Sequence, residues 1–171
     1  MQVKPSYQLH LHIARRNLDA YIFHMTKTKI TEWSGCPARY AAGIFGDKWC
    51  FLIMRDVLLL GRRTYSDFLN SPEGISTNIL ANRLAKLEDA GILNRKIDPR
   101  KASRVCYFPT RKARDLLPTL ISMMVWSTVY DETTEAPASF AAAYKSDPAE
   151  TLAWYEAEID RVDTEIFNTT V

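Results

Sequence analysis

Residues 76–109 place an amphipathic helix directly before a basic hairpin, and this order restricts what the chain can fold into. Ser76 is a good N-cap, Gly91 is a good stop, and leucines recur between them at the i, i+4 and i+7 positions of one helix face. Two short extended segments, 92–97 and 104–108, follow at once and are joined by residues with turn composition. The segment therefore predicts a helix packed through its leucine stripe, followed by a β-hairpin with a basic tip.

Three helices are expected before this unit. Pro37 suits the first turn of a helix over 37–45, and the run 48–60 is apolar on nearly all sides, as in a buried helix. Thr64 and Asp67 form a capping-box pattern at the start of a short helix, 65–69. The turn-rich sequence after it separates this short helix from the leucine-striped one.

Helices are also expected after the hairpin. Thr110 can cap a long helix over 111–130, in which Pro118 predicts a kink or a restart. The sequence 147–150 supplies a cap, a first-turn proline and a glutamate for a helix in the tail. A stripe in that helix is expected to pack against the body or against another subunit: Leu152, Tyr155, Ile159, Val162 and Ile166.

This order of elements is the winged helix-turn-helix plan, a mainly α fold with a small β-wing. In that plan the polar N-terminal residues of helix 76–90 face base edges in the major groove, and the basic wing, 98–104, contacts phosphates. Serine, threonine and asparagine can all hydrogen-bond to bases. The candidate DNA-contacting residues are Arg63, Thr64, Ser76, Thr77, Asn78, Asn82, Lys86, Arg100, Lys101 and Arg104.

The distribution of charge supports a polyanionic partner although the whole chain carries only +2. Residues 1–130 hold 20 Lys and Arg against 10 Asp and Glu, a net charge of +10. Residues 131–171 hold two basic residues against ten acidic ones, a net charge of −8. A solvated basic loop would explain the charges near the hairpin equally well. The acidic tail either packs on the dimer helices, away from DNA, or competes with DNA for the wing.

Residues 35–126 resemble the HxlR-type regulators, a MarR-like branch of the winged helix-turn-helix transcription factors. The resemblance rests on Cys36-Pro37, Gly46-Asp47-Lys48-Trp49, Arg55-Asp56, Gly74-Ile75-Ser76, Leu80, Arg83-Leu84, Leu87, Ala90-Gly91, Tyr107 and Leu116-Leu117-Pro118. Three features depart from the pattern: Glu73 stands where a proline is usual, Cys106 stands where an acidic residue is common, and Thr110-Arg111-Lys112-Ala113 lacks the usual glycine near the start of the long helix.

The resemblance implies a homodimer, joined through helices flanking the reading head, on a pseudo-palindromic double-stranded DNA operator. A small-molecule effector between the reading heads and the dimer helices would fit the same plan. The resulting domains are an N-terminal extension, 1–34, an HxlR-type domain, 35–130, and an acidic helical tail, 131–171.

Cys36 has two interpretations. It matches a position that serves some family members as a redox-sensing thiol, and Arg39, Lys48 and the following helix N-terminus would favour its thiolate. Alternatively, it is a small buried cysteine that fills the core. Cys50 is expected to be buried and inert, and Cys106 to be partly exposed.

Other classes of protein find little support. The sequence has no Walker loop, HExxH, GxSxG or zinc-ligand pattern, so we predict neither an enzyme nor a cofactor or metal site; His10 and His12 alone do not make one. No apolar run reaches membrane-span length, no secretory signal is visible, and a cytoplasmic location is expected. Met25 is a candidate true start. The alternative function is a winged-helix adaptor that binds proteins without sequence-specific DNA binding.

Overall fold

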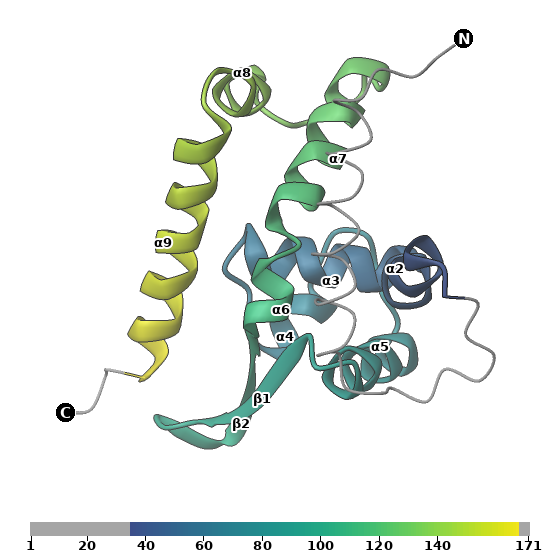
Figure 1. Ribbon diagram of the computed structural model, residues 1–171. Helices are drawn as coiled ribbons and strands as arrows, with labels where there is room; N and C mark the ends of the chain where they lie inside the picture. Colours follow the sequence, from purple (N-terminus) through teal and green to yellow (C-terminus); the bar gives the residue numbers. More distant parts are fainter. Residues whose placement is uncertain (1–34, 168–171) are drawn as a thin grey trace, which may run out of the picture. The chain divides into compact units, whose positions relative to one another are not determined.

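The computed structural model describes residues 35–167, and the predictions for His10, His12 and Met25 lie outside this range. The elements follow in the order α2 (Pro37–Phe45), α3 (Lys48–Leu58), α4 (Tyr65–Leu69), α5 (Thr77–Asp89), β1 (Leu93–Asp98), β2 (Lys101–Pro109), α6 (Arg111–Arg114), α7 (Leu117–Tyr130), α8 (Ala138–Ser146) and α9 (Pro148–Phe167) (Figure 1). A mainly helical body with one small antiparallel hairpin among the described residues confirms the expected winged helix-turn-helix fold.

The central helix of the body is α3, which lies against α5. Its N-terminus is capped by Asp47, whose carboxylate accepts hydrogen bonds from the N–H groups of Trp49 and Cys50. The helix ends at Leu58, two residues earlier than expected, and the chain turns at Gly61 with φ of +64°. Removing apolar side chains from water is the main stabilisation of such a core. Fully or almost fully buried members from both helices are Cys50, Ile53, Met54, Val57, Leu58, Leu80, Leu84 and Leu87.

The hairpin is longer than the sequence predicted. Residues 98–103 were expected to form a loop, but β1 pairs with β2 until Asp98 faces Lys101, so that only Pro99 and Arg100 connect the strands. The Asp98 carboxylate accepts a hydrogen bond of 2.8 Å from the Arg100 N–H, which closes the turn. The base of the hairpin is tied to the body, because the Tyr107 N–H donates to the carbonyl of Arg63 at 2.7 Å.

The expected interruption near Pro118 is present. The helical segment that starts at Thr110 breaks between Arg114 and Leu117, and α7 restarts with Pro118 in its first turn. The Thr110 hydroxyl caps α6 by accepting a hydrogen bond from the Ala113 N–H. α7 then runs away from the hairpin (Figure 1).

Two helices rather than one form the tail. The sequence did not predict α8, an alanine-rich helix that links α7 to α9. α9 starts as expected, with the Asp147 carboxylate accepting a hydrogen bond from the Glu150 N–H. Ile159 in the α9 stripe is 2% exposed and belongs to the core of the body. The stripe therefore packs against its own chain and does not need a second subunit to bury it. By their contacts α8 and α9 belong to the same compact unit as the body.

None of the helices within residues 35–167 combines the length and the hydropathy that crossing a membrane requires.

Candidate nucleic-acid interface

The outer face of α5 is polar and exposed over its first turns. Thr77, Asn78 and Asn82 are exposed, while the leucines on the opposite side of the helix are buried. Ser76 occupies the N-cap position, but its hydroxyl makes no capping hydrogen bond within the described residues and is exposed. The α5 side chains with base-reading chemistry therefore face solvent together, as direct readout in a major groove requires.

Two contacts from other elements fix the position of α5. The Arg83 Nε donates to the Asp47 carboxylate at 2.6 Å, joining α5 to the cap of α3. At the N-terminal end, the Tyr65 hydroxyl donates to the Thr77 carbonyl at 2.9 Å. Burial alone would raise the pKa of Asp47, but hydrogen bonds from the Cys50 N–H, Arg83 and the Trp49 N–H outweigh it and hold that pKa below its ordinary value. The motif residues Asp47 and Arg83 thus act as a pair.

The turn before α5 is closed by an ion-pair network. Arg55 forms ion pairs with Asp56 and Glu73, and the Ser71 hydroxyl donates to the other Glu73 carboxylate oxygen at 2.6 Å. Arg62 completes the network through the buried Asp56 at 2.8 Å. Glu73, where the sequence departs from the family pattern, therefore has a structural role. It anchors the turn by charge where a proline would restrict the backbone.

Some cations of the wing form ion pairs within the wing and others do not. Arg100 and Arg104 both form ion pairs with Asp98, whose carboxylate they cover completely. Hydrogen bonds from Arg100, then Arg104, hold the pKa of Asp98 well below its usual range. Arg95 and Lys101 are also exposed, and neither forms an ion pair with any residue in 35–167. Arg95 was not among the predicted contacts. It is one of the exposed residues of β1, and its charge next to the wing could have indicated it.

Three other predicted contacts are buried or half-buried. The Arg63 side chain is 1% exposed and its Nε donates to Asp163 of α9 at 2.9 Å, so Arg63 is left out of the interface. Thr64 is half-buried and caps α4 by accepting a hydrogen bond from the Asp67 N–H. Lys86 is half-buried in the last turns of α5.

The cysteines differ from the predictions at two positions. Cys36 is exposed just before α2, so the interpretation that it fills the core is wrong. Cys106 was expected to be partly exposed, but it is buried, because its strand faces the body and the wing arginines cover its neighbour Asp98. Burial raises the pKa of both Cys50 and Cys106, which disfavours their thiolates.

The described residues hold no group of three or more histidine, cysteine or acidic side chains placed to bind a metal ion. The candidate functional surface in this part of the chain is a set of polar and cationic side chains, on α5 and on the hairpin. Both elements lie at the same end of the body (Figure 1).

The HxlR-like helix-turn-helix model matches residues 44–135, which include α3, α5, the hairpin and α7. The chain belongs to this family. The match includes both ends of the Asp47–Arg83 pair, the Glu73 network and the whole wing, whereas Asp163, the partner of Arg63, lies outside it.

Two relatives of this HxlR-like chain are named as HTH-type transcriptional regulators. It is 36% identical over 88 residues to sll1512 of Synechocystis sp., an uncharacterised HTH-type transcriptional regulator; the match covers 52% of this chain and 64% of that protein. It is 30% identical over 98 residues to the HTH-type transcriptional regulator YodB of Bacillus subtilis, covering 57% of this chain and 87% of YodB. The chain thus spans less than two thirds of the length of sll1512.

A solved structure shares the fold. PA1607, a proposed transcription factor, superposes with a TM-score of 0.54 at 29% identity, over 61% of this chain and 71% of that one.

Proposed function

We propose that this HxlR-like protein is a transcriptional regulator that binds double-stranded DNA in a sequence-specific manner. The observation that carries the proposal is the joint exposure of Asn78 and Asn82 on α5 and of Arg95 and Lys101 on the wing. Asparagine side chains can pair bidentately with adenine, and the wing cations can neutralise phosphates. The names of sll1512 and YodB support this role.

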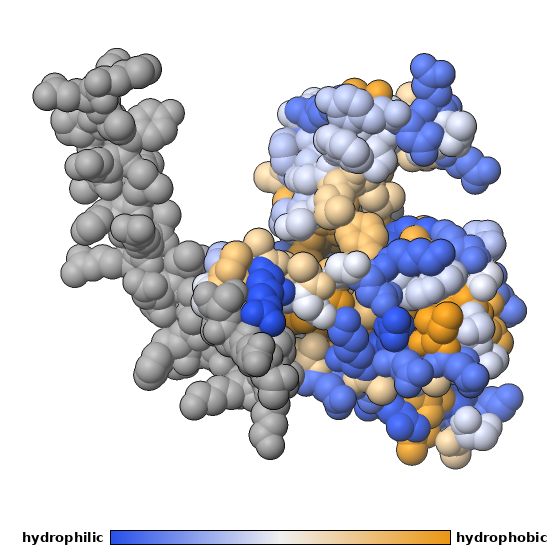
Figure 2. Space-filling view, turned by 90° about the vertical axis from the view of Figure 1, so that its right-hand side faces the viewer, coloured by the Kyte–Doolittle hydropathy of each residue, from blue (hydrophilic) through white to orange (hydrophobic). Residues whose placement is uncertain are grey.

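We further propose that the protein acts as a homodimer on an operator with two half-sites. α7 presents exposed apolar side chains that no other described element covers: Met123, Trp126, Val129 and Tyr130. On the face that Figure 2 shows, hydrophilic and hydrophobic residues alternate over the lower body, and paler residues lie above it. An exposed apolar stripe on a helix that projects from the reading head suits isologous pairing with a second copy. Two reading heads related by two-fold symmetry would then meet half-sites about one DNA turn apart.

Recovery of genomic fragments with the purified protein, followed by binding measurements at several salt concentrations, tests the proposal. Asn78→Ala or Asn82→Ala should weaken operator binding by about 1–3 kcal/mol and leave non-specific binding unchanged. Lys101→Ala should weaken binding to all DNA alike and lower the salt slope by about one. Asn94→Ala, at an exposed uncharged wing position, is the control and should change neither quantity.

The adaptor alternative makes the opposite prediction. A protein-binding winged helix would show no salt-dependent affinity for DNA and no enrichment of one site with inverted repeats. Either result would overturn the proposed function.

A further inference from the structure

The C-terminal end of α9 lies against the wing. The rings of Phe167 and Phe108 have centroids 4.8 Å apart, and the Lys96 ammonium lies 4.8 Å from the Phe167 centroid and 5.7 Å from that of Phe108. Phe108 belongs to β2 and Lys96 to β1, so one α9 residue contacts both strands of the wing. Residues of α9 lie outside the region that the family model matches.

A second contact joins α9 to the base of the wing through Arg63. The Arg63 Nη2 lies 2.8 Å from the Asp163 carboxylate, and its Nη1 donates to the Val57 carbonyl at the end of α3 at 2.6 Å. The backbone carbonyl of Arg63 accepts a hydrogen bond from the Tyr107 N–H of β2. Arg63 thus links α9, α3 and the wing, and its guanidinium is almost completely buried.

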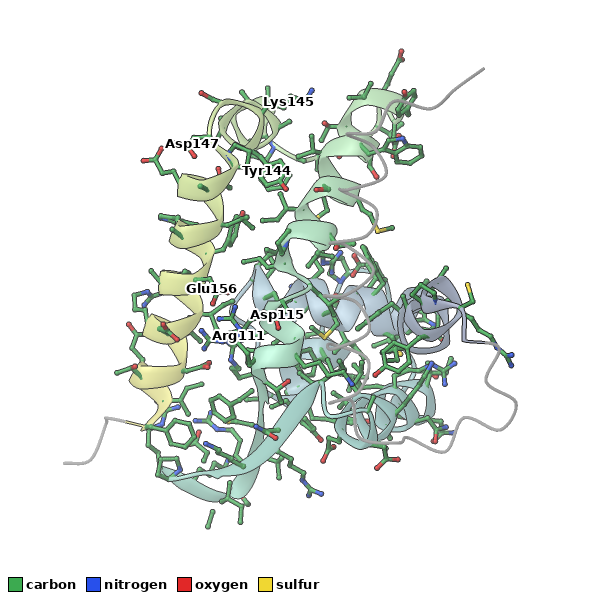
Figure 3. The ribbon with its side chains drawn as sticks, in the orientation of Figure 1. Arg111, Asp115, Tyr144, Lys145, Asp147 and Glu156 are labelled. Atoms are coloured by element: carbon green, nitrogen blue, oxygen red, sulfur yellow. The ribbon has the colours of Figure 1, made fainter. Side chains whose placement is uncertain are left out.

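Close packing leaves α9 little freedom at this point. A Cβ added to Gly61 would come within 3.2 Å of the Val162 side chain, so Val162 of α9 packs tightly on the α3–α4 connection at Gly61. Arg114 of α6 adds ion pairs to Glu156, Asp160 and Asp163, and Glu156 lies on the side of α9 that faces α6 (Figure 3). Several α9 acids are therefore engaged by the body's own arginines.

We propose that α9 is a brace that holds the wing in the orientation required for phosphate contact, with Asp163 and Phe167 as its positioning residues. The brace gives a role to three acids of the tail, Glu156, Asp160 and Asp163, because they neutralise Arg63 and Arg114 within the chain. The inference rests on the proposed DNA-binding function for its consequence, whereas the contact between α9 and the wing can be tested without DNA.

Two acidic residues on α9 provide a matched pair of variants. Asp163→Asn removes the charge that pairs with Arg63 and Arg114, while Asp160→Asn removes an equal charge from an exposed side chain that, among residues 35–167, pairs with Arg114 alone. A brace predicts that only Asp163→Asn loosens the wing. A competing tail predicts that both variants tighten DNA binding equally, since each makes the tail less acidic.

The first measurement is amide hydrogen exchange of residues 104–107 in the free full-length protein. Asp163→Asn and Phe167→Ala should speed this exchange by on the order of tenfold, because the wing opens more often. Phe167→Tyr should restore slow exchange, and Trp154→Ala, at a 60%-exposed position on the same helix, should leave it slow. Unchanged exchange in both Asp163→Asn and Phe167→Ala overturns the brace.

The second measurement is DNA affinity as a function of salt. Asp163→Asn should weaken binding and lower the salt slope by about one for each phosphate that the loosened wing no longer neutralises, although the variant is more positively charged. Asp160→Asn should not lower the slope, and equal tightening by both variants overturns the brace. If the wild-type protein binds no DNA, the proposed function fails, and the exchange measurement alone decides whether α9 braces the wing.

Discussion

Arg83 of α5 donates a hydrogen bond of 2.6 Å to Asp47, the residue that caps α3. One carboxylate therefore satisfies the free N–H groups at the start of α3 and fixes the position of α5. Loss of an N-cap side chain costs about 1–2 kcal/mol, so Asp47→Ala should lower the free energy of unfolding by that amount. Arg83→Ala should cost less, about 0.5–1 kcal/mol, because the pair is partly exposed.

Urea denaturation of both single variants and the double variant measures the coupling. The double variant should lose less stability than the two single variants together, because both remove the same contact. Strict additivity would show that the two side chains act independently.

The pH dependence of stability should reveal the Glu73 anchor. The hydrogen bond from Arg55 is the main cause that lowers the pKa of Glu73 from 4.5 to about 2. Because the folded-state pKa is depressed, the stabilisation is complete above about pH 4.5 and is lost as the pH falls toward 2. The Glu73 side chain is 30% exposed, so Glu73→Gln should cost about 1 kcal/mol at neutral pH rather than the full value of the shift.

Chemical denaturation between pH 2 and pH 7 checks this expectation. The wild-type protein and Glu73→Gln should converge at the acidic end. Glu132→Gln, at an exposed position between α7 and α8, should follow the wild-type curve throughout. A constant difference between the wild-type protein and Glu73→Gln at all pH values would contradict the assignment.

Asp98 should restrain the wing arginines. On DNA, phosphates must compete with its carboxylate for Arg100 and Arg104, and Asp98→Asn removes the competing charge while keeping an oxygen for the Arg100 N–H. We expect tighter non-specific binding and a steeper salt slope, by up to about two, in fluorescence anisotropy titrations. Asp115→Asn makes the same change of charge away from the wing. An equal gain from Asp115→Asn would show that the effect is general electrostatics rather than release of the arginines.

Local patterns in the sequence were sufficient to predict most of the helices. The leucine stripe of α5, the Thr64–Asp67 capping box and the restart near Pro118 depend on neighbouring residues only, and the structure confirms each of them. α8 was missed because it has neither a capping side chain nor a strong amphipathic pattern.

The misplaced details depend on long-range contacts. Arg63 looks like any basic residue before a helix, and its burial is decided by Asp163, one hundred positions later. The wing loop was predicted too long because residues 98–103 have turn composition, yet in the structure the strands pair until Asp98 faces Lys101. Helical periodicity was sufficient to predict which candidate residues of α5 are exposed. It could not predict which cations of the wing form ion pairs.

Cys36 should be the reactive thiol of the protein. The chain has three cysteines, and Cys50 and Cys106 are buried with raised pKa values. Brief alkylation near pH 7 should therefore modify one cysteine per folded chain, and none in Cys36→Ser, as read by intact mass. Operator affinity before and after a mild oxidant then tests redox sensing. Equal loss of affinity in the wild-type protein and in Cys36→Ser would show that Cys36 is not the sensor.

Trp126 should be central to the proposed dimer. Its ring is 63% exposed, lies 5.0 Å from that of Tyr130, and belongs to the apolar stripe of α7. Large aromatic side chains dominate the energetics of such interfaces, so Trp126→Glu should weaken association by at least about a hundredfold. Trp154→Glu, an equally exposed aromatic position on α9, is the matched control and should remain dimeric. Sedimentation equilibrium decides between them, because a wild-type protein that sediments at the chain mass of 19.6 kDa, or a Trp126→Glu variant that stays at twice that mass, contradicts pairing through α7.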